Sequence, residues 1–128
     1  MVKEVEKTES GSYIKQAEEF LDLAKKGFES KYYNAAGFNA IQAIINANDA
    51  ICIFILGRRA SADHREAVKL HTDVIRIIND ATQKRRLSGA LEQRSETGYL
   101  GKSISKYTAE KLIKDAIVFL EWVKKHLK

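Results

Sequence analysis

The 128-residue sequence contains no proline and only one cysteine, Cys52. A single cysteine cannot form an intrachain disulfide, so a small disulfide-stapled scaffold is excluded. Strict alternation of apolar and polar residues, which is typical of a half-buried strand, is also scarce, whereas helical spacing recurs along the chain. We therefore expect one helical domain, which at this length can bury a core without covalent staples.

Long apolar runs are also missing. The first residues, MVKEVEKTESG, are charged and have no apolar signal core, and the longest uninterrupted apolar stretch covers only residues 50–56. A bilayer-spanning helix needs roughly 20 residues. These absences predict a cytoplasmic protein with no membrane partner. Residues 1–10 are expected to be a flexible tail, and residues 11–128 a single domain.

Charge of one sign is only slightly in excess. The chain has 22 lysines and arginines against 17 aspartates and glutamates, which gives a net charge of +5. A surplus of this size permits a polyanionic partner but does not require one.

Apolar residues at i, i+3 and i+4 spacing predict four long helices and a short one. The expected helices cover about residues 12–28, 31–56, 63–78, 83–93 and 108–127, and a glycine-containing loop is expected over 95–107. Such a pattern predicts an all-α helical bundle.

The second expected helix is unusual because apolar or small residues occupy nearly every side of it. Asp49 is the only charged residue between Tyr32 and Leu56, and Gly57 is placed to end the helix as its C-terminal cap. A helix that is apolar all round is predicted to be buried. Its five amide side chains then need partners on neighbouring helices, on a second subunit or in water. They are Asn34, Asn39, Gln42, Asn46 and Asn48.

Charged residues gather in the joint after Gly57, which reads GRRASADHREAV. Asp63 followed by Glu66 has the spacing of a capping box and predicts the start of the third helix. Capping does not explain Arg58, Arg59 and His64, which lie close together in the same short stretch.

Three stretches, in this order and spacing, resemble the HEPN superfamily of small helical bundles. The first is YYNAAGFNAIQAIINANDAICIFILGRRASADHREAV, the second is LEQRSETGY and the third is TAEKLIKDAIVFLEWVKKHL. The resemblance implies an antiparallel four-helix bundle with a short extra helix, often a homodimer. It also implies association with RNA or nucleotides, frequently beside a nucleotidyltransferase-type partner protein in a toxin–antitoxin pair.

Some HEPN proteins are metal-independent endoribonucleases marked by an arginine and a histidine with four to six residues between them. Arg59 and His64 satisfy this spacing, and so does Arg58 with one more residue. His64 suits the role of base or acid, because its intrinsic pKa lies near neutrality. Either arginine is suited to clamping a phosphate, and Asp49 to orienting an arginine from the buried helix.

A structural interpretation of the same residues stays open. Asp63 and Glu66 then only cap a helix, the two arginines are solvated, and Asp49 is a polar anchor or an interface residue. His71 falls on an apolar stripe and is expected in the core. The three histidines lack the spacing of a metal site, so neither a metal nor a cofactor is expected.

A second candidate site is the basic segment at residues 81–106, which holds six basic residues against two glutamates. Its candidates for binding nucleic acid or nucleotides are Lys84, Arg85, Arg86, Arg94 and Tyr99. Cations neutralise phosphates and an aromatic ring stacks on a base. A solvated helix end explains the same charges about as well.

The sequence thus favours a nucleic-acid- or nucleotide-associated accessory or toxin-type protein that acts with a partner protein. Two alternatives remain: a metal-independent endoribonuclease that uses Arg59 and His64, and a non-catalytic dimeric interaction module. Whether the protein is an enzyme is left open. RNA cleavage that persists in EDTA separates the enzyme from the other two.

Overall fold

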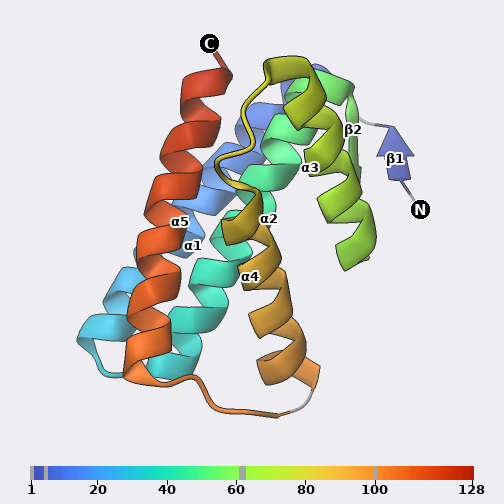
Figure 1. Cartoon of the computed structure of the whole chain (residues 1–128). Helices are drawn as coiled ribbons and strands as arrows, with labels where there is room; N and C mark the ends of the chain where they lie inside the picture. The colour runs from blue at the N-terminus through green and yellow to red at the C-terminus, as the bar shows by residue number, and fades with distance from the viewer. Residues whose placement is uncertain (1, 5, 61–62, 100) are drawn as a thin grey trace.

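The computed structural model describes residues 2–4, 6–60, 63–99 and 101–128, with the side chains of residues 2–4, 98 and 99 excepted. These residues form α1 (Ser10–Glu29), α2 (Tyr33–Leu56), α3 (His64–Ile78), α4 (Lys84–Arg94) and α5 (Lys106–His126). The predicted all-α helical bundle is confirmed (Figure 1).

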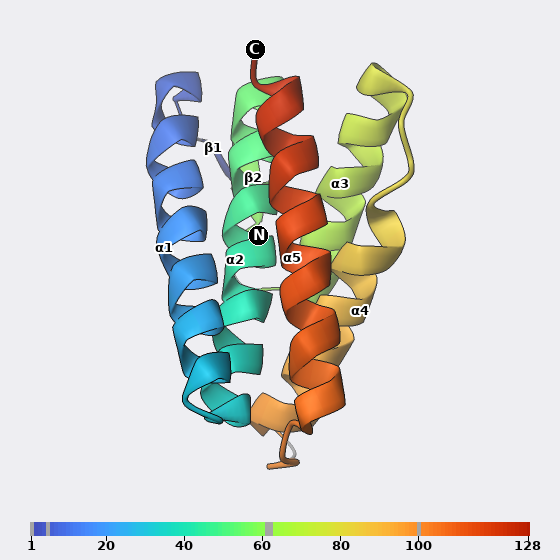
Figure 2. The same ribbon diagram turned by 90° about the vertical axis from the view of Figure 1, so that its left-hand side faces the viewer.

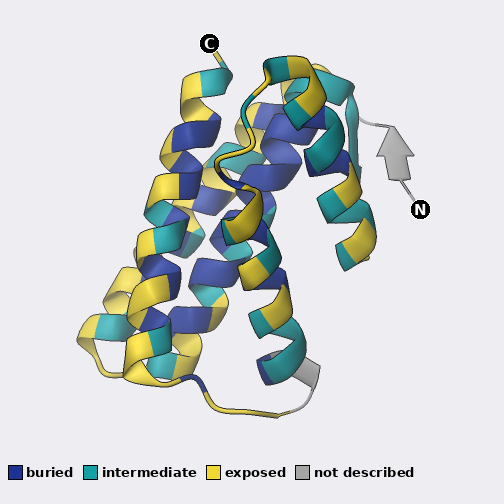
Figure 3. Ribbon diagram, viewed as in Figure 1, coloured by how far each residue is buried: buried dark blue, intermediate teal, exposed yellow. Residues whose placement is uncertain are grey.

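Helix α2 is the centre of the bundle and contacts each of the other four helices. Helices α1, α2 and α5 lie side by side as three long rods, and α3 and α4 form the other side (Figure 2). Burial follows this arrangement, because α2 is mostly buried and the outer faces of α1 and α5 are exposed (Figure 3). By length and composition α2 passes as a membrane-spanning helix, but 61% of its most apolar window is buried inside the bundle, as in the core helix of a soluble protein.

Both predicted boundaries of the joint after α2 are confirmed. Gly57 ends α2 with a left-handed φ of 70°, a conformation that glycine adopts without strain. Asp63 begins α3 as its N-cap, where its carboxylate accepts a hydrogen bond of 2.8 Å from the backbone N–H of Arg65.

Three of the five amide side chains of α2 bond to other elements, as predicted, whereas Gln42 donates to Asn46 and Asn39 donates to the Ala35 carbonyl within α2 itself. Asn46 donates to the Gln16 side chain of α1 at 3.1 Å and accepts from Gln42 at 2.8 Å. Oδ1 of Asn48 accepts a hydrogen bond of 2.9 Å from Nδ1 of His71. Asn34 accepts a bond of 2.7 Å from the backbone N–H of Ile104 and so fixes the segment that leads into α5.

The N-terminal segment differs from the flexible tail expected over residues 1–10. Strand β1 (Val2–Glu4) pairs antiparallel with β2 (Arg58–Ala60), in the register Val2 with Ala60 and Glu4 with Arg58. A 3₁₀ turn over Lys7–Glu9 then leads directly into α1. Sequence periodicity misses this ribbon because its strands are three residues long and far apart in the chain.

The segment between α4 and α5 also differs from the expected loop. Residues Ser95–Tyr99 continue α4 as a π-helix, and α5 begins at Lys106. Ser105 is the N-cap of α5 and accepts a 3.1 Å bond from the backbone N–H of Thr108. Residues 101–105 have no regular secondary structure, as predicted for a loop, and Leu100 lies outside the described residues.

Candidate functional site

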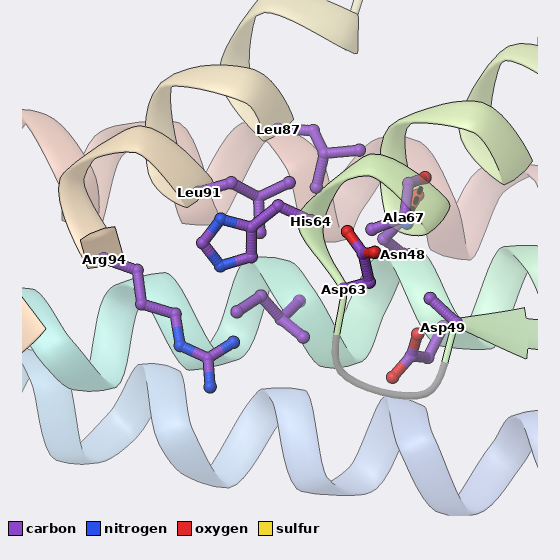
Figure 4. A pocket seen from close by; sticks show the side chains of 10 residues that line it. Asn48, Asp49, Asp63, His64, Ala67, Leu87, Leu91 and Arg94 are labelled. Carbon is purple, nitrogen blue, oxygen red and sulfur yellow. Dashed lines mark hydrogen bonds between the residues drawn. The ribbon is translucent and has the colours of Figure 1, made fainter. Parts of the chain in front are cut away.

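His64 is the first residue of α3, and its side chain lies against the end of α4. Its Nδ1 lies 3.3 Å from Oγ of Ser95, the first residue of the π-helix, and its ring is half-buried. Arg94 precedes Ser95 and lines the same small pocket (Figure 4). The fold therefore joins two segments that are 31 positions apart in the chain.

The surroundings of His64 favour its neutral form. Partial burial and the positive charge of Arg94 both lower the pKa of His64, and the nearby Asp63 carboxylate opposes them with a smaller effect. A neutral imidazole at physiological pH is able to accept a proton. Because Nδ1 faces Ser95, Nε2 is the nitrogen left for a bound molecule.

The pocket beside His64 is small, with a volume of about 50 Å³. It is lined by Ile45, Asn48, Asp49, Ala60, Asp63, His64, Ala67, Leu87, Leu91 and Arg94. A water molecule fits into such a space, but a whole nucleotide does not. A large ligand would therefore meet His64 and Arg94 at the mouth of the pocket.

The arginine that shares the pocket with His64 is Arg94 and not Arg59, the partner expected from the sequence. Arg59 lies in β2, where its guanidinium stacks on the Tyr13 ring with 5.6 Å to the centroid and donates to the Ala60 carbonyl at 3.1 Å. Arg58 is the neighbouring half-buried residue of β2, and it does not line the pocket either.

Asp49 is a buried carboxyl in the wall of this pocket. Its side chain is carried by α2, and the residue is 9% exposed. Burial raises the pKa of Asp49 to about 7, because desolvation disfavours the carboxylate, and the charge of Arg59 offsets only part of that effect. The pocket thus contains a carboxyl whose pKa is raised to about 7 and an imidazole whose pKa lies below its ordinary value.

A second hollow, with a volume of about 800 Å³, lies at the start of α4 against α5. Its cationic residues are Lys84, Arg85, Arg86 and Lys111. Asp115 accepts from Arg86 at 3.3 Å and from Lys111 at 2.9 Å, so these two cations are already paired. Lys84 and Arg85 are exposed and have no ion pair with any described residue.

Two further residues considered from the sequence are His71 and Tyr99, of which His71 lines neither hollow. His71 is fully buried against Phe119 and Trp122, and burial lowers its pKa to about 4, so the expected core position is confirmed. The side chain of Tyr99 lies outside the described residues.

The sequence reasoning missed the roles of Ser95 and of Arg94 beside His64. The helical spacing of Leu87, Leu91 and Ser95 gives them a common face, which is a signal available in the sequence. What that face meets depends on how α3 packs against α4, and no local pattern encodes that.

A family model described as the HEPN domain matches residues 11–126. The chain belongs to the HEPN family. The resemblance seen in the sequence is confirmed, and the match is consistent with a nucleic-acid-associated or ribonuclease-type function. A search of curated proteins found no match. Among the described residues, no group of three histidine, cysteine, aspartate or glutamate side chains is placed to hold a metal ion.

Proposed function

We propose that this HEPN protein binds single-stranded RNA through the phosphates that lie along α4. The observation that carries the proposal is the placement of unpaired cations at both ends of this helix. Lys84 and Arg85 lie at its start and Arg94 at its end, and none of the three forms an ion pair with a described residue. Uncompensated cations on one element are the usual footprint of a polyanion.

Helix α4 is long enough to contact several phosphates of one RNA strand rather than a single phosphate. Lys84 and Arg94 lie ten positions apart, which corresponds to about 15 Å along a helix axis. Consecutive phosphates of a helical strand lie about 3.4 Å apart along its axis. The two ends of α4 are thus able to contact different nucleotides of one strand.

Salt dependence tests the proposal directly. We expect the affinity for a decauridylate RNA to fall steeply with salt, and the double variant Lys84→Ala, Arg85→Ala to reduce the slope of log K against log salt by roughly 0.7 per lost contact. The matched control is Lys15→Ala, Lys25→Ala, which removes the same charge from exposed positions of α1. Salt-insensitive binding, or equal losses in both double variants, would contradict the proposal.

A second candidate is RNA cleavage, and the pairing of His64 with Arg94 in one pocket favours it. In this reaction neutral His64 would take the proton of a 2′-hydroxyl while the 2′-oxygen bonds to the adjacent phosphorus and the bond from phosphorus to the 5′-oxygen breaks. The guanidinium would stabilise the charge that develops on the phosphate. Asp49 lies in the same pocket, and its protonated carboxyl would supply the proton that the leaving 5′-oxygen takes.

Incubation with RNA in EDTA tests this candidate. We expect products ending in a 2′,3′-cyclic phosphate, a loss of at least about a hundredfold in rate for His64→Ala, and little change for His126→Ala at the far end of α5. No cyclic-phosphate product, or equal cleavage by His64→Ala, would exclude cleavage and leave RNA binding as the function.

The homodimer, the nucleotidyltransferase-type partner protein and the toxin–antitoxin role implied by the resemblance stay predictions. Recovery of a nucleotidyltransferase encoded beside this chain, as a stable complex with it, would support the last two. Its absence from the neighbouring genes would favour the non-catalytic dimeric interaction module.

A further inference from the structure

A third hollow lies between α3 and α4 and adjoins the two hollows that hold Lys84, Arg85 and Arg94 of α4. Its volume is about 460 Å³. It shares Ser88 with the basic hollow at the start of α4, and it shares His64 and Leu91 with the small pocket at the end of α4. The three hollows therefore adjoin one another through these shared residues, and we call the one that is lined by Ser88, Leu91 and Glu92 of α4 the α3–α4 groove.

We infer that the α3–α4 groove holds a nucleobase of the bound RNA strand, with the strand's phosphates at the two cationic ends of α4. The inference rests on the proposed function, since it names what part of the RNA lies between the two phosphate contacts. It assigns a base-binding role to Val68 and Leu91.

The chemistry of the groove fits a base better than a phosphate. Val68 of α3 is half-buried and Leu91 of α4 is 4% exposed, so the two form an apolar floor. A flat heteroaromatic ring gains from such a surface, because bases are often held between aromatic or apolar side chains. The groove is also within the size range of small-molecule sites, about 300–1,000 Å³.

The rim of the groove has the charge that a nucleotide requires. Arg65 and Lys69 are exposed on α3, and neither side chain forms an ion pair with any described residue. The Ser88 hydroxyl and the Glu92 carboxylate stand on the α4 side, where they are able to bond the polar edge of a base. An apolar floor with cations on its α3 side is complementary to an uncharged ring whose flanking phosphates lie on that side, and the Glu92 carboxylate faces the ring edge instead.

The first measurement uses the wild-type protein alone. We compare binding of decauridylate with binding of a ten-unit ribose-phosphate strand that has no bases, so that the number of phosphates is the same. We expect the abasic strand to bind about tenfold more weakly. In methyl NMR spectra, the signals of Val68 and Leu91 should move with decauridylate and stay in place with the abasic strand.

Two variants test whether the preference for decauridylate over the abasic strand arises in the α3–α4 groove. Val68→Gln keeps the charge and the approximate size but makes the floor polar, and we expect it to remove most of the tenfold preference and to leave the salt dependence unchanged. Val118→Gln is the control, since Val118 is 41% exposed on α5 and lines none of the three hollows. Thermal unfolding shows that each variant is folded.

Each outcome decides between the two proposals. Equal binding of both strands, with unmoved Val68 and Leu91 methyls, overturns the base site and leaves phosphate binding intact. A tenfold preference that survives Val68→Gln places the base elsewhere and also overturns it. Absence of salt-dependent binding to either strand overturns the proposed function and the base site together. Methyl shifts that follow protein concentration without RNA would show a second copy in the groove and would exclude the base.

Discussion

At the scale of single residues, Asp49 shows most clearly a conflict between stability and function. A carboxyl that is 9% exposed loses most of its hydration, and among the described groups only the charge of Arg59 partly compensates it. Proteins keep such groups at sites where function outweighs stability. The position of Asp49 in the same pocket as His64 and Arg94 agrees with that interpretation.

The stability of the protein should therefore depend on the ionisation of Asp49. Its pKa is about 7 in the folded chain against an ordinary 3.8, so the folded state holds the proton more firmly than the unfolded state does. Stability from this group is present at acidic pH and is lost as the pH rises from about 4 through about 7. Asp49→Asn cannot ionise, so we expect its melting temperature to rise relative to the wild type over this pH range.

Thermal unfolding at a series of pH values measures this difference, which corresponds to a few kcal/mol in free energy of unfolding. Asp22→Asn is the control, because Asp22 lies exposed on α1 in an ion pair with Lys26. A constant difference between Asp49→Asn and the wild type at all pH values would refute the expectation.

Residues whose role follows from local chemistry were predictable from the sequence. Gly57 and Asp63 mark helix ends by their own conformational and hydrogen-bonding preferences, and His71 was placed in the core by spacing alone. Arg59 and Arg94 were not predictable in the same way. Strand pairing holds Arg59 beside Tyr13, and helix packing brings Arg94 to His64, so both positions depend on contacts distant in sequence.

At the scale of elements, the turn between α3 and α4 is attached to α5 by one side chain. Asp80 accepts from the backbone and the hydroxyl of Thr82 at 3.0 and 2.6 Å, and from Nε1 of Trp122 at 2.9 Å. These hydrogen bonds, those from Thr82 above all, hold the pKa of Asp80 well below its usual range. The turn sets where α4 begins, and hence where its cations lie.

We expect Asp80→Ala to lower the free energy of unfolding by about 1–3 kcal/mol, because the Trp122 indole and the turn both lose their acceptor. A carboxyl with a depressed pKa stabilises the fold above its ordinary pKa, and this contribution is lost as the pH falls below about 4. The advantage of the wild type over Asp80→Ala should therefore shrink in acid. Urea unfolding followed by Trp122 fluorescence measures it.

Asp73→Ala provides the comparison for this turn. Asp73 pairs at 3.6 Å with Arg76, whose side chain is 77% exposed, and a surface pair of this kind contributes about 0–1 kcal/mol. Equal losses in Asp80→Ala and Asp73→Ala would show that the turn is not held by Asp80.

The long helices were predictable because their apolar spacing repeats over many turns, whereas the π-helix and the β1–β2 ribbon were not. Each is short, and each depends on a neighbour that the sequence does not identify. The π-helix matters for the site because it begins at Ser95, next to Arg94. Such turns occur often at functional positions.

At the scale of the whole molecule, one face of α2 is left partly open. Phe38, Gln42 and Ile45 follow one another at helical spacing, and Phe38 is 41% exposed on an otherwise buried helix. The same face continues to Asp49, which together with Ile45 lines the His64 pocket. A second copy on this face would lie beside the pocket.

We therefore keep the homodimer as a prediction and expect Phe38→Glu to weaken it, since a charge buried in an apolar interface is costly. Sedimentation velocity at several concentrations should show a dimer for the wild type and a monomer for the variant. Tyr107→Glu, at a site on α5 that is 77% exposed, should remain a dimer. A wild-type monomer at every concentration would contradict the prediction.

The β1–β2 ribbon has a practical consequence for anyone who prepares this protein. Residues 2–4 pair with β2, the strand that precedes Asp63 and His64 in the chain. A purification tag joined before residue 2 could therefore disturb the segment that carries the histidine. The C-terminus follows α5 and stands clear of that ribbon in Figure 1. An affinity tag placed there is the safer choice for binding and cleavage assays.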